Sequence, residues 1–232
     1  SEDGSISTHA LTFSTVHGMY KELYAYRDLM TDVIVQQLET DQKVRIRCKD
    51  YVKKIAVYKD KLAVQLPDKL VIYQKIESDD PDDMQYRMMT TIEDNLKCNL
   101  LVITSHHVIL CMEKKLLLYT MEGKKERTWS MDSVIRYIKV NGGPEKGEGV
   151  LVGLKDGMCL KIFINNDFPV ELVNHGASVR CLDMSAFRKK LAVVDENSAV
   201  VVYDVKTKAV LFEGKGANSV AFNSVYEDMF CY

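Results

Sequence analysis

Long hydrophobic runs and an excess of charge of one sign are both missing from this sequence. The longest uncharged apolar stretch, residues 99–111, is interrupted by polar and histidine residues. It is shorter than the roughly 20 residues that a membrane-spanning helix needs. The 31 basic and 33 acidic side chains leave a net charge of −2, which creates no field for a phosphate backbone or an anionic membrane. We therefore expect no nucleic acid partner and no direct insertion into a membrane.

Closely spaced cysteines are missing as well. The six cysteines are at least 13 residues apart, so no CxxC pair exists. Most of them lie in apolar runs, where a thiol behaves as a small buried hydrophobic group. The N-terminal residues 1–4 lack the basic and then apolar pattern of a secretion signal. We expect reduced core cysteines in a cytosolic protein, without a disulfide or zinc framework and without a cofactor.

Proline is scarce, with four residues in 232, yet the sequence shows no long helical pattern. Short runs rich in Val, Ile, Leu and Tyr alternate instead with polar turns, which is typical of strands. Hydrophobic residues make up 47% of the chain, which is enough for a sizeable core. The predicted strands span residues 54–58, 61–66 and 69–76 in the clearest set, and residues 23–27, 32–37 and 43–48 in the set before it.

Such triplets of strands recur along the chain at a nearly constant period. The third strand of each triplet ends on an aromatic residue, at positions 73, 119, 163 and 203, with intervals of 46, 44 and 40 residues. The innermost strands begin near positions 55, 100, 136, 180 and 219, with similar intervals. Both landmarks match the roughly 40–45 residues of a WD-type propeller blade.

We therefore predict an all-β fold, a WD40-type β-propeller with five to six blades present. A blade cannot bury both of its faces alone, so blades stack around an axis and form their core between neighbours. Residues 1–232 are expected to form a single propeller region whose C-terminal blade, after residue 218, is incomplete. Because closed propellers commonly use about six to eight blades, we expect a fragment of a longer chain and part of a larger propeller.

Residues 175–212 resemble a WD repeat in the order and spacing of their motifs. In that family, a loop histidine, a Ser or Thr, a turn Asp and a Trp form a hydrogen-bonded network. The resemblance implies that His175, Asp195 and Tyr203 take three of these places. The Ser/Thr place falls at positions 193–194, which are both valine, so the repeat is degenerate and its network incomplete.

The same histidine and aspartate invite a catalytic interpretation, with Ser185 as the nucleophile, because a base oriented by a carboxylate activates a serine. The alternative is that His175 and Asp195 hold a loop against a turn, while Ser185 begins a turn after the inner strand. We favour the alternative and predict that the protein is not an enzyme. A propeller enzyme would need carboxylates, histidines or a metal at equivalent blade positions, and the inner strands repeat no such residue.

Residues 141–149 form a glycine-rich loop with one lysine, which resembles a phosphate-binding loop. The loop lacks the Gly-Lys-Ser/Thr ending, and no helix follows it. We predict a long turn between the first and second strands of a blade, and a candidate partner surface, because long loops on rigid scaffolds often carry contacts. The candidate interaction residues are Asn141, Gly142, Gly143, Pro144 and Lys146.

Three further clusters carry weaker signals for a site. His106 and His107 are adjacent on a strand, so their imidazoles point to opposite faces, and we predict no metal site there. Residues 79–83 are acidic but lack the ligand spacing of a calcium loop, which favours a solvated insertion between outer strands. Residues 188–190 are basic and are interpreted as a solvated turn.

Several segments resemble one specific family, the WD-repeat subunits of intraflagellar transport complex A in cilia. These segments are Tyr24-Ala-Tyr-Arg-Asp through Asp32-Val-Ile-Val-Gln-Gln, Lys53-Lys-Ile-Ala-Val-Tyr, Gln65-Leu-Pro, Ile135-Arg-Tyr-Ile-Lys-Val with Asn141-Gly-Gly-Pro, Leu151-Val-Gly-Leu, and Val179-Arg-Cys-Leu-Asp-Met-Ser through Leu191-Ala-Val-Val-Asp-Glu-Asn. They cover most of the chain in one order, apart from residues 77–97 and both ends.

The resemblance implies two N-terminal propellers and a helical-repeat solenoid in the full protein, with this chain forming most of the second propeller. It also implies a non-catalytic scaffold in cilia, basal bodies and cytoplasm that acts in retrograde transport and membrane-cargo delivery. The implied partners are other WD-and-solenoid subunits of complex A and membrane cargo adaptors. Two alternatives stay open, a vesicle-coat-type propeller scaffold and a propeller enzyme with a site in its central channel, because fold alone does not fix function.

Overall fold

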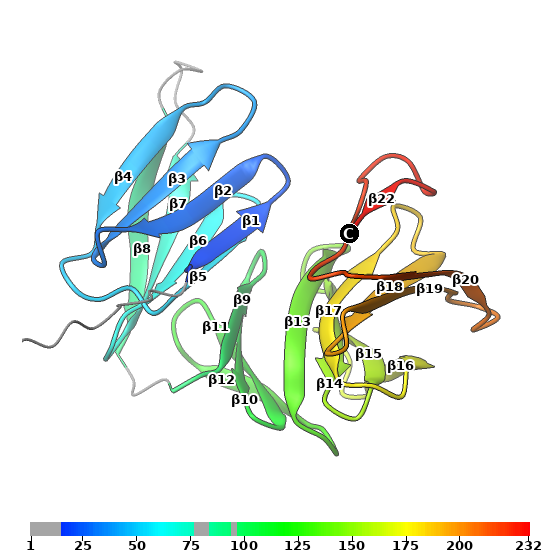
Figure 1. Cartoon of the computed structure of the whole chain (residues 1–232). Coiled ribbons are helices and arrows are strands. Elements are labelled where there is room, and N and C mark those ends of the chain that lie inside the picture. Colours follow the sequence, from blue (N-terminus) through cyan, green and yellow to red (C-terminus); the bar gives the residue numbers. More distant parts are fainter. Residues whose placement is uncertain (1–14, 77–83, 94–96) are drawn as a thin grey trace, which may run out of the picture.

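The chain folds into a series of antiparallel sheets that follow one another in sequence order. The computed structural model describes residues 15–76, 84–93 and 97–232, and all regular elements in these ranges are strands. They form five four-stranded sheets and a final two-stranded sheet, and in every sheet consecutive strands are neighbours. This architecture confirms the predicted all-β propeller with five to six blades. Figure 1 shows the sheets as an open arc, with the first and the last sheet on opposite sides of the opening.

The strand bounds are as follows. The first sheet contains β1 (His17–Tyr20), β2 (Leu23–Asp28), β3 (Asp32–Gln37) and β4 (Lys43–Arg47), and the second contains β5 (Lys54–Tyr58), β6 (Lys61–Gln65), β7 (Leu70–Ile76) and β8 (Gln85–Ile92). The third contains β9 (Leu100–Ile103), β10 (His107–Met112), β11 (Lys115–Thr120) and β12 (Lys125–Ser130). The fourth contains β13 (Ile135–Gly142), β14 (Gly149–Leu154), β15 (Met158–Phe163) and β16 (Val170–Asn174). The fifth contains β17 (Val179–Met184), β18 (Lys190–Asp195), β19 (Ala199–Asp204) and β20 (Val210–Lys215), and the last contains β21 (Ala221–Phe222) and β22 (Phe230–Cys231).

The first strand of each sheet lies next to the first strand of the following sheet. Strand β5 packs beside both β1 and β9, and β13 packs beside both β9 and β17, so these strands line the inside of the arc. This arrangement confirms the predicted innermost strands. The last landmark, at position 219, lies two residues before β21 begins.

The hydrophobic core is divided into five clusters, each shared by two successive sheets. The cluster between the fourth and fifth sheets, for example, joins Leu151 and Cys159 to Val179, Leu182 and Leu191. Each sheet therefore covers the apolar face of its neighbour, as the repeat predicts. The outer strands are largely exposed; β20, for instance, has no buried residue, although it begins with three apolar residues. The outer strand of the first sheet, β4, was predicted at residues 43–48.

The third-strand aromatics do not all occupy one register. Tyr73, Tyr119 and Tyr203 each pair with the second residue of the preceding strand. Phe163 pairs instead with Gly149, which is the first residue of β14, so Ile162 takes the equivalent place in the fourth sheet. The four aromatics lie on third strands as predicted, but Phe163 does not occupy the position of the other three. An apolar run alone does not fix which of two adjacent residues faces which side of the sheet.

Candidate functional site: a buried histidine network and the loop of residues 141–149

His175 lies just before β17 and connects two other elements of the fifth sheet. Its Nδ1 atom is 2.7 Å from the hydroxyl oxygen of Tyr203 on β19, and its Nε2 atom is 3.4 Å from a carboxylate oxygen of Asp195 at the end of β18. The side chains of His175 and Asp195 are only 6% and 7% exposed. The structure therefore brings together the three residues that the WD resemblance selects.

The tyrosine hydroxyl changes the form of this network. The hydroxyl of Tyr203 contacts His175 directly. The histidine therefore has a partner on each side, although positions 193–194, where the WD pattern has a hydroxyl, are valines. The other carboxylate oxygen of Asp195 accepts hydrogen bonds from the backbone amides of Asn197 and Ala199, both at 2.9 Å. Burial alone would raise the pKa of the Asp195 carboxyl, but these amides and His175 outweigh it, and the pKa is lowered.

Ser185 takes no part in this network. Val179 pairs with Asp195 at one end of the β17–β18 hairpin, whereas Met184, next to Ser185, pairs with Leu191 at the other end. Four to five residues of extended chain separate the two ends by roughly 15 Å. The Ser185 hydroxyl donates instead to Glu227 at 2.5 Å and accepts from the backbone amide of Lys190. The arrangement holds loops in place and contains no serine nucleophile beside the histidine.

The loop of residues 141–149 connects β13 to β14, the first and second strands of the fourth sheet, as predicted. Asn141 and Gly142 belong to β13 and are half-buried, as is Gly143, whereas Pro144 and Lys146 are exposed. Gly143 has a φ of 140°, which only glycine adopts readily. Of the five predicted interaction residues, only Pro144 and Lys146 are therefore exposed.

Two glutamates fix this loop against other sheets. Glu145 lies 3.9 Å from the Lys59 ammonium of the second sheet and 3.5 Å from the His106 imidazole of the third. Glu148 is fully buried and accepts a hydrogen bond of 3.2 Å from the backbone amide of Ser105. The loop thus crosses from the fourth sheet to the second and third, and it displays its exposed residues on a fixed frame. Sequence reasoning missed both anchors because their partners lie 39 or more residues away in the sequence.

The adjacent histidines contact different carboxylates. His106 faces Glu145, and His107 on β10 lies 3.0 Å from Glu126 on β12. Over residues 15–76, 84–93 and 97–232, no group of three or more His, Cys, Asp or Glu side chains is arranged to hold a metal ion. The acidic residues 79–83 lie outside the described residues. In the described ranges no helix is long and apolar enough to cross a membrane.

The cysteines of the structure are free thiols. Cys111, Cys159 and Cys181 are buried, as the apolar runs predict, whereas Cys231 on the short strand β22 is exposed. Burial raises the pKa of the Cys111 and Cys159 thiols to about 12. These two core thiols are therefore poor nucleophiles at neutral pH.

Comparison with known proteins identifies the family. The family model described as "IFT122 second beta-propeller" matches residues 17–232. The chain belongs to this family. The chain is also 58% identical over 231 residues to the intraflagellar transport protein 122 homolog of Homo sapiens, 57% to that of Xenopus tropicalis and 55% to that of Danio rerio. These matches cover the whole chain but only 18–19% of each relative, so the chain spans about a fifth of their length.

Solved structures agree on the fold of this IFT122-family propeller. KlHsv2 with loop 6CD replaced by a Gly-Ser linker superposes with a TM-score of 0.61 at 14% identity, covering 88% of this chain and 70% of that one. Hsv2 of Kluyvelomyces marxianus gives a TM-score of 0.60 at 13% identity, with 89% and 70% covered. At such identities the likeness concerns the fold alone. The resemblance to an intraflagellar transport family that the sequence segments suggest is confirmed at the level of the IFT122 family.

Proposed function

We propose that this propeller is a non-catalytic protein-interaction scaffold within a subunit of intraflagellar transport complex A. The observation that carries the proposal is the identity of 55–58% along the whole chain to intraflagellar transport protein 122 homologs of four vertebrates. The matched region is about a fifth of those proteins, so the role of the whole protein enters here as part of the proposal.

The architecture supports a binding role. Successive sheets share their cores, and the frame therefore resists deformation while it exposes loops at its rims. Hydrogen bonds join His175 to Asp195 and Tyr203 and stabilise the fifth sheet. Ser185, the nucleophile of the catalytic interpretation, does not lie beside them. A specific interface needs only about 800 Å² on each partner, which the rim of such a frame can supply.

The finer parts of the proposal follow from the family. We propose that the partners are other WD-and-solenoid subunits of complex A and membrane cargo adaptors. We place the protein in the cilium, the basal body and the cytoplasm, acting in retrograde transport and in delivery of membrane cargo. Residues 1–232 are proposed to be one propeller region whose last sheet, with only two strands in the described residues, is completed by further chain of the longer protein.

Co-purification of the full-length protein from ciliated cells tests the proposal. We expect mass spectrometry to recover complex A subunits; recovery of coat proteins without them would refute the ciliary assignment. A paired comparison tests the loop: Lys146→Glu reverses an exposed charge on the loop of residues 141–149, and Lys155→Glu makes the same change at the β14–β15 turn, at the other end of β14. Loss of a partner with the first variant only would assign that partner to the loop.

A further inference from the structure

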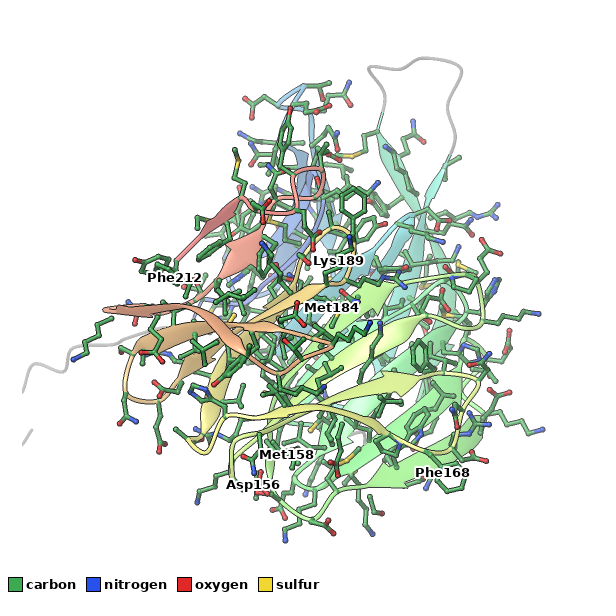
Figure 2. All side chains as sticks on the ribbon, turned by 90° about the vertical axis from the view of Figure 1, so that its right-hand side faces the viewer. Asp156, Met158, Phe168, Met184, Lys189 and Phe212 are labelled. Carbon is green, nitrogen blue, oxygen red and sulfur yellow. The ribbon has the colours of Figure 1, made fainter. Side chains whose placement is uncertain are left out.

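One loop of the fourth sheet presents an aromatic side chain to solvent. Phe168 lies in residues 164–169, the loop that connects β15 to β16, and it is 77% exposed. Figure 2 shows Phe168 at the periphery of the fold, well apart from Asp156 and Met158 at the other end of β15. The core of the protein therefore gains little from this phenylalanine.

Two side chains of β12 in the third sheet hold the loop in place. Trp129 is 2% exposed, and its Nε1 atom donates a hydrogen bond of 3.0 Å to the carbonyl oxygen of Asn166. The Arg127 guanidinium donates a hydrogen bond to the carbonyl oxygen of Ile164 and lies 2.6 Å from the carboxylate of Asp167. The backbone that carries the exposed aromatic ring is therefore fixed, and docking onto a partner need not order it.

The loop also adjoins the candidate interaction loop of residues 141–149. A Cβ atom at Gly147 would lie 3.4 Å from the side-chain nitrogen of Asn165 and 3.4 Å from Pro144 Cγ, so Gly147 lies between the two loops. The Ile164 amide donates a hydrogen bond of 3.1 Å to the carbonyl oxygen of Glu148. The two loops thus form one surface, on which Phe168 is the exposed aromatic residue.

The equivalent loops of the other four complete sheets contain no aromatic residue. They span residues 38–42, 77–84, 121–124 and 205–209 in the sequence. A sheet of this protein therefore does not need an aromatic side chain at this place in order to fold. Isolated exposed apolar residues are common on protein surfaces, but this ring is carried by a loop that four contacts from another sheet and from its own residues restrain.

The position of the loop in the arc limits what can cover it. The fourth sheet has a complete four-stranded sheet on each side. The opening of the arc lies between the first and the last sheet (Figure 1), so chain that closes the ring would not cover Phe168.

The charges of this surface indicate the chemistry of its partner. In residues 141–149 and 164–171 the exposed acidic residues, Glu145, Asp167 and Glu171, outnumber the one exposed basic residue, Lys146. Within the described residues, Glu171 has no ion pair, whereas Glu145 and Asp167 do. An anionic bilayer would repel such a surface, whereas basic side chains of another protein would attract it.

We propose that Phe168 is an anchor residue that inserts into an apolar pocket, bordered by Lys or Arg side chains, on a partner subunit. This inference rests on the proposed scaffold function and adds a recognition site to it. Aromatic residues that fill a desolvated pocket commonly supply much of the binding energy of an interface. Full burial of a phenylalanine side chain corresponds to a change in affinity of about 10- to 100-fold.

Retention of partner subunits by the full-length protein tests this anchor. Phe168→Ala truncates an exposed side chain, so hydrogen exchange in β15 and β16 should be unchanged, while retention of a complex A subunit should fall by that factor. Phe187→Ala is the matched control, because Phe187 is 67% exposed on the β17–β18 turn of the next sheet. Equal retention by the two variants would overturn the inference, whereas absence of complex A subunits from the unsubstituted protein would overturn the proposed function.

A charge reversal tests the basic border of the pocket. Glu171→Lys should lower retention of the same subunit, and more strongly at low ionic strength, because exposed charges are screened by salt. Glu213→Lys makes the same change at an exposed position of β20, the outer strand of the fifth sheet, and should have no effect. Equal effects of the two reversals would contradict a basic border.

Two further measurements distinguish a partner subunit from the other possible ligands of Phe168. Flotation with vesicles of phosphatidylcholine and phosphatidylserine should recover no protein; recovery that Phe168→Ala abolishes would assign the ring to lipid and overturn the inference. Hydrogen exchange of the full-length protein without partners should be the same for Phe168→Ala and the unsubstituted protein outside residues 1–232. Faster exchange there would show that Phe168 docks onto the protein's own remaining chain and not onto a partner.

Discussion

Gly153→Ala should disrupt the packing between the fourth and fifth sheets. A Cβ atom at position 153 would lie 2.4 Å from Val179 Cγ1 and 2.9 Å from Val179 Cβ, far inside van der Waals contact. Val179 is 1% exposed and belongs to the cluster that joins the two sheets, so it has little space to move. Overpacking of a core costs about 1–3 kcal/mol. We expect amides of β14 and β17 in the full-length protein to exchange about 5- to 150-fold faster, since each 1.4 kcal/mol is a factor of ten.

A double substitution tests the reasoning more strictly than the single one. Val179→Ala alone removes two buried methyl groups and should cost about 1–3 kcal/mol. If the clash with the Cγ1 atom is the cause, Val179→Ala removes the 2.4 Å contact and leaves the 2.9 Å contact with Cβ, so the double variant should be destabilised by less than the sum of the two single variants. Gly153→Ala with Val200→Ala, a buried valine in the cluster between the fifth and last sheets, is the control and should be additive. Additive effects for Gly153 and Val179 as well would refute the packing argument.

Three further outcomes follow from the buried groups. Tyr203→Phe should leave His175 without one of its two partners and cost about 1–3 kcal/mol, seen as faster exchange confined to the fifth sheet; an equal change in all sheets would contradict this role. Iodoacetamide at neutral pH should label Cys231 and leave Cys111 unlabelled, since a pKa of about 12 lowers the thiolate fraction about a thousandfold relative to an ordinary thiol. Because the pKa of Asp195 is lowered in the folded state, its contribution to stability is present above the ordinary carboxyl pKa of about 4 and is lost as the pH falls through the folded pKa. The protection of amides in the β18–β19 turn, relative to their exchange rate in the unfolded chain, should therefore fall below about pH 4 in the natural protein. In Asp195→Asn this protection should not change with pH.

Much of the fold was predictable because strand signals are local. The alternation of apolar and polar residues and the two-residue turn at 59–60 identify β5 and β6 without knowledge of their neighbours. The first strand of the chain, β1, was missed because none of its residues is buried. The register of Phe163 was misjudged because it depends on how β15 aligns with β14, which a one-residue shift reverses.

The candidate sites were less predictable. His175, Asp195 and Tyr203 could be selected from a repeat pattern, but the direct contact between the histidine and the tyrosine hydroxyl depends on the packing of β19 against the preceding loop. The anchors of the loop at Glu145 and Glu148 join residues of different sheets. No spacing in the sequence distinguishes them from solvated charges.

The sequence by itself determined the repeat, the strand-based architecture and the family, because period, turn residues and segment identity are properties of neighbouring residues. Only the tertiary structure decided which charges are buried and which are paired. In the sequence, nothing distinguishes Lys161 from an exposed strand lysine. Only the strand register shows that it occupies the position of a core residue in the other sheets, namely Val35, Ile72, Leu118 and Val202. Its surroundings are set by Gly149, where a Cβ atom would lie 2.6 Å from the Lys161 Cε atom, and burial is a property of that packing rather than of the residue type.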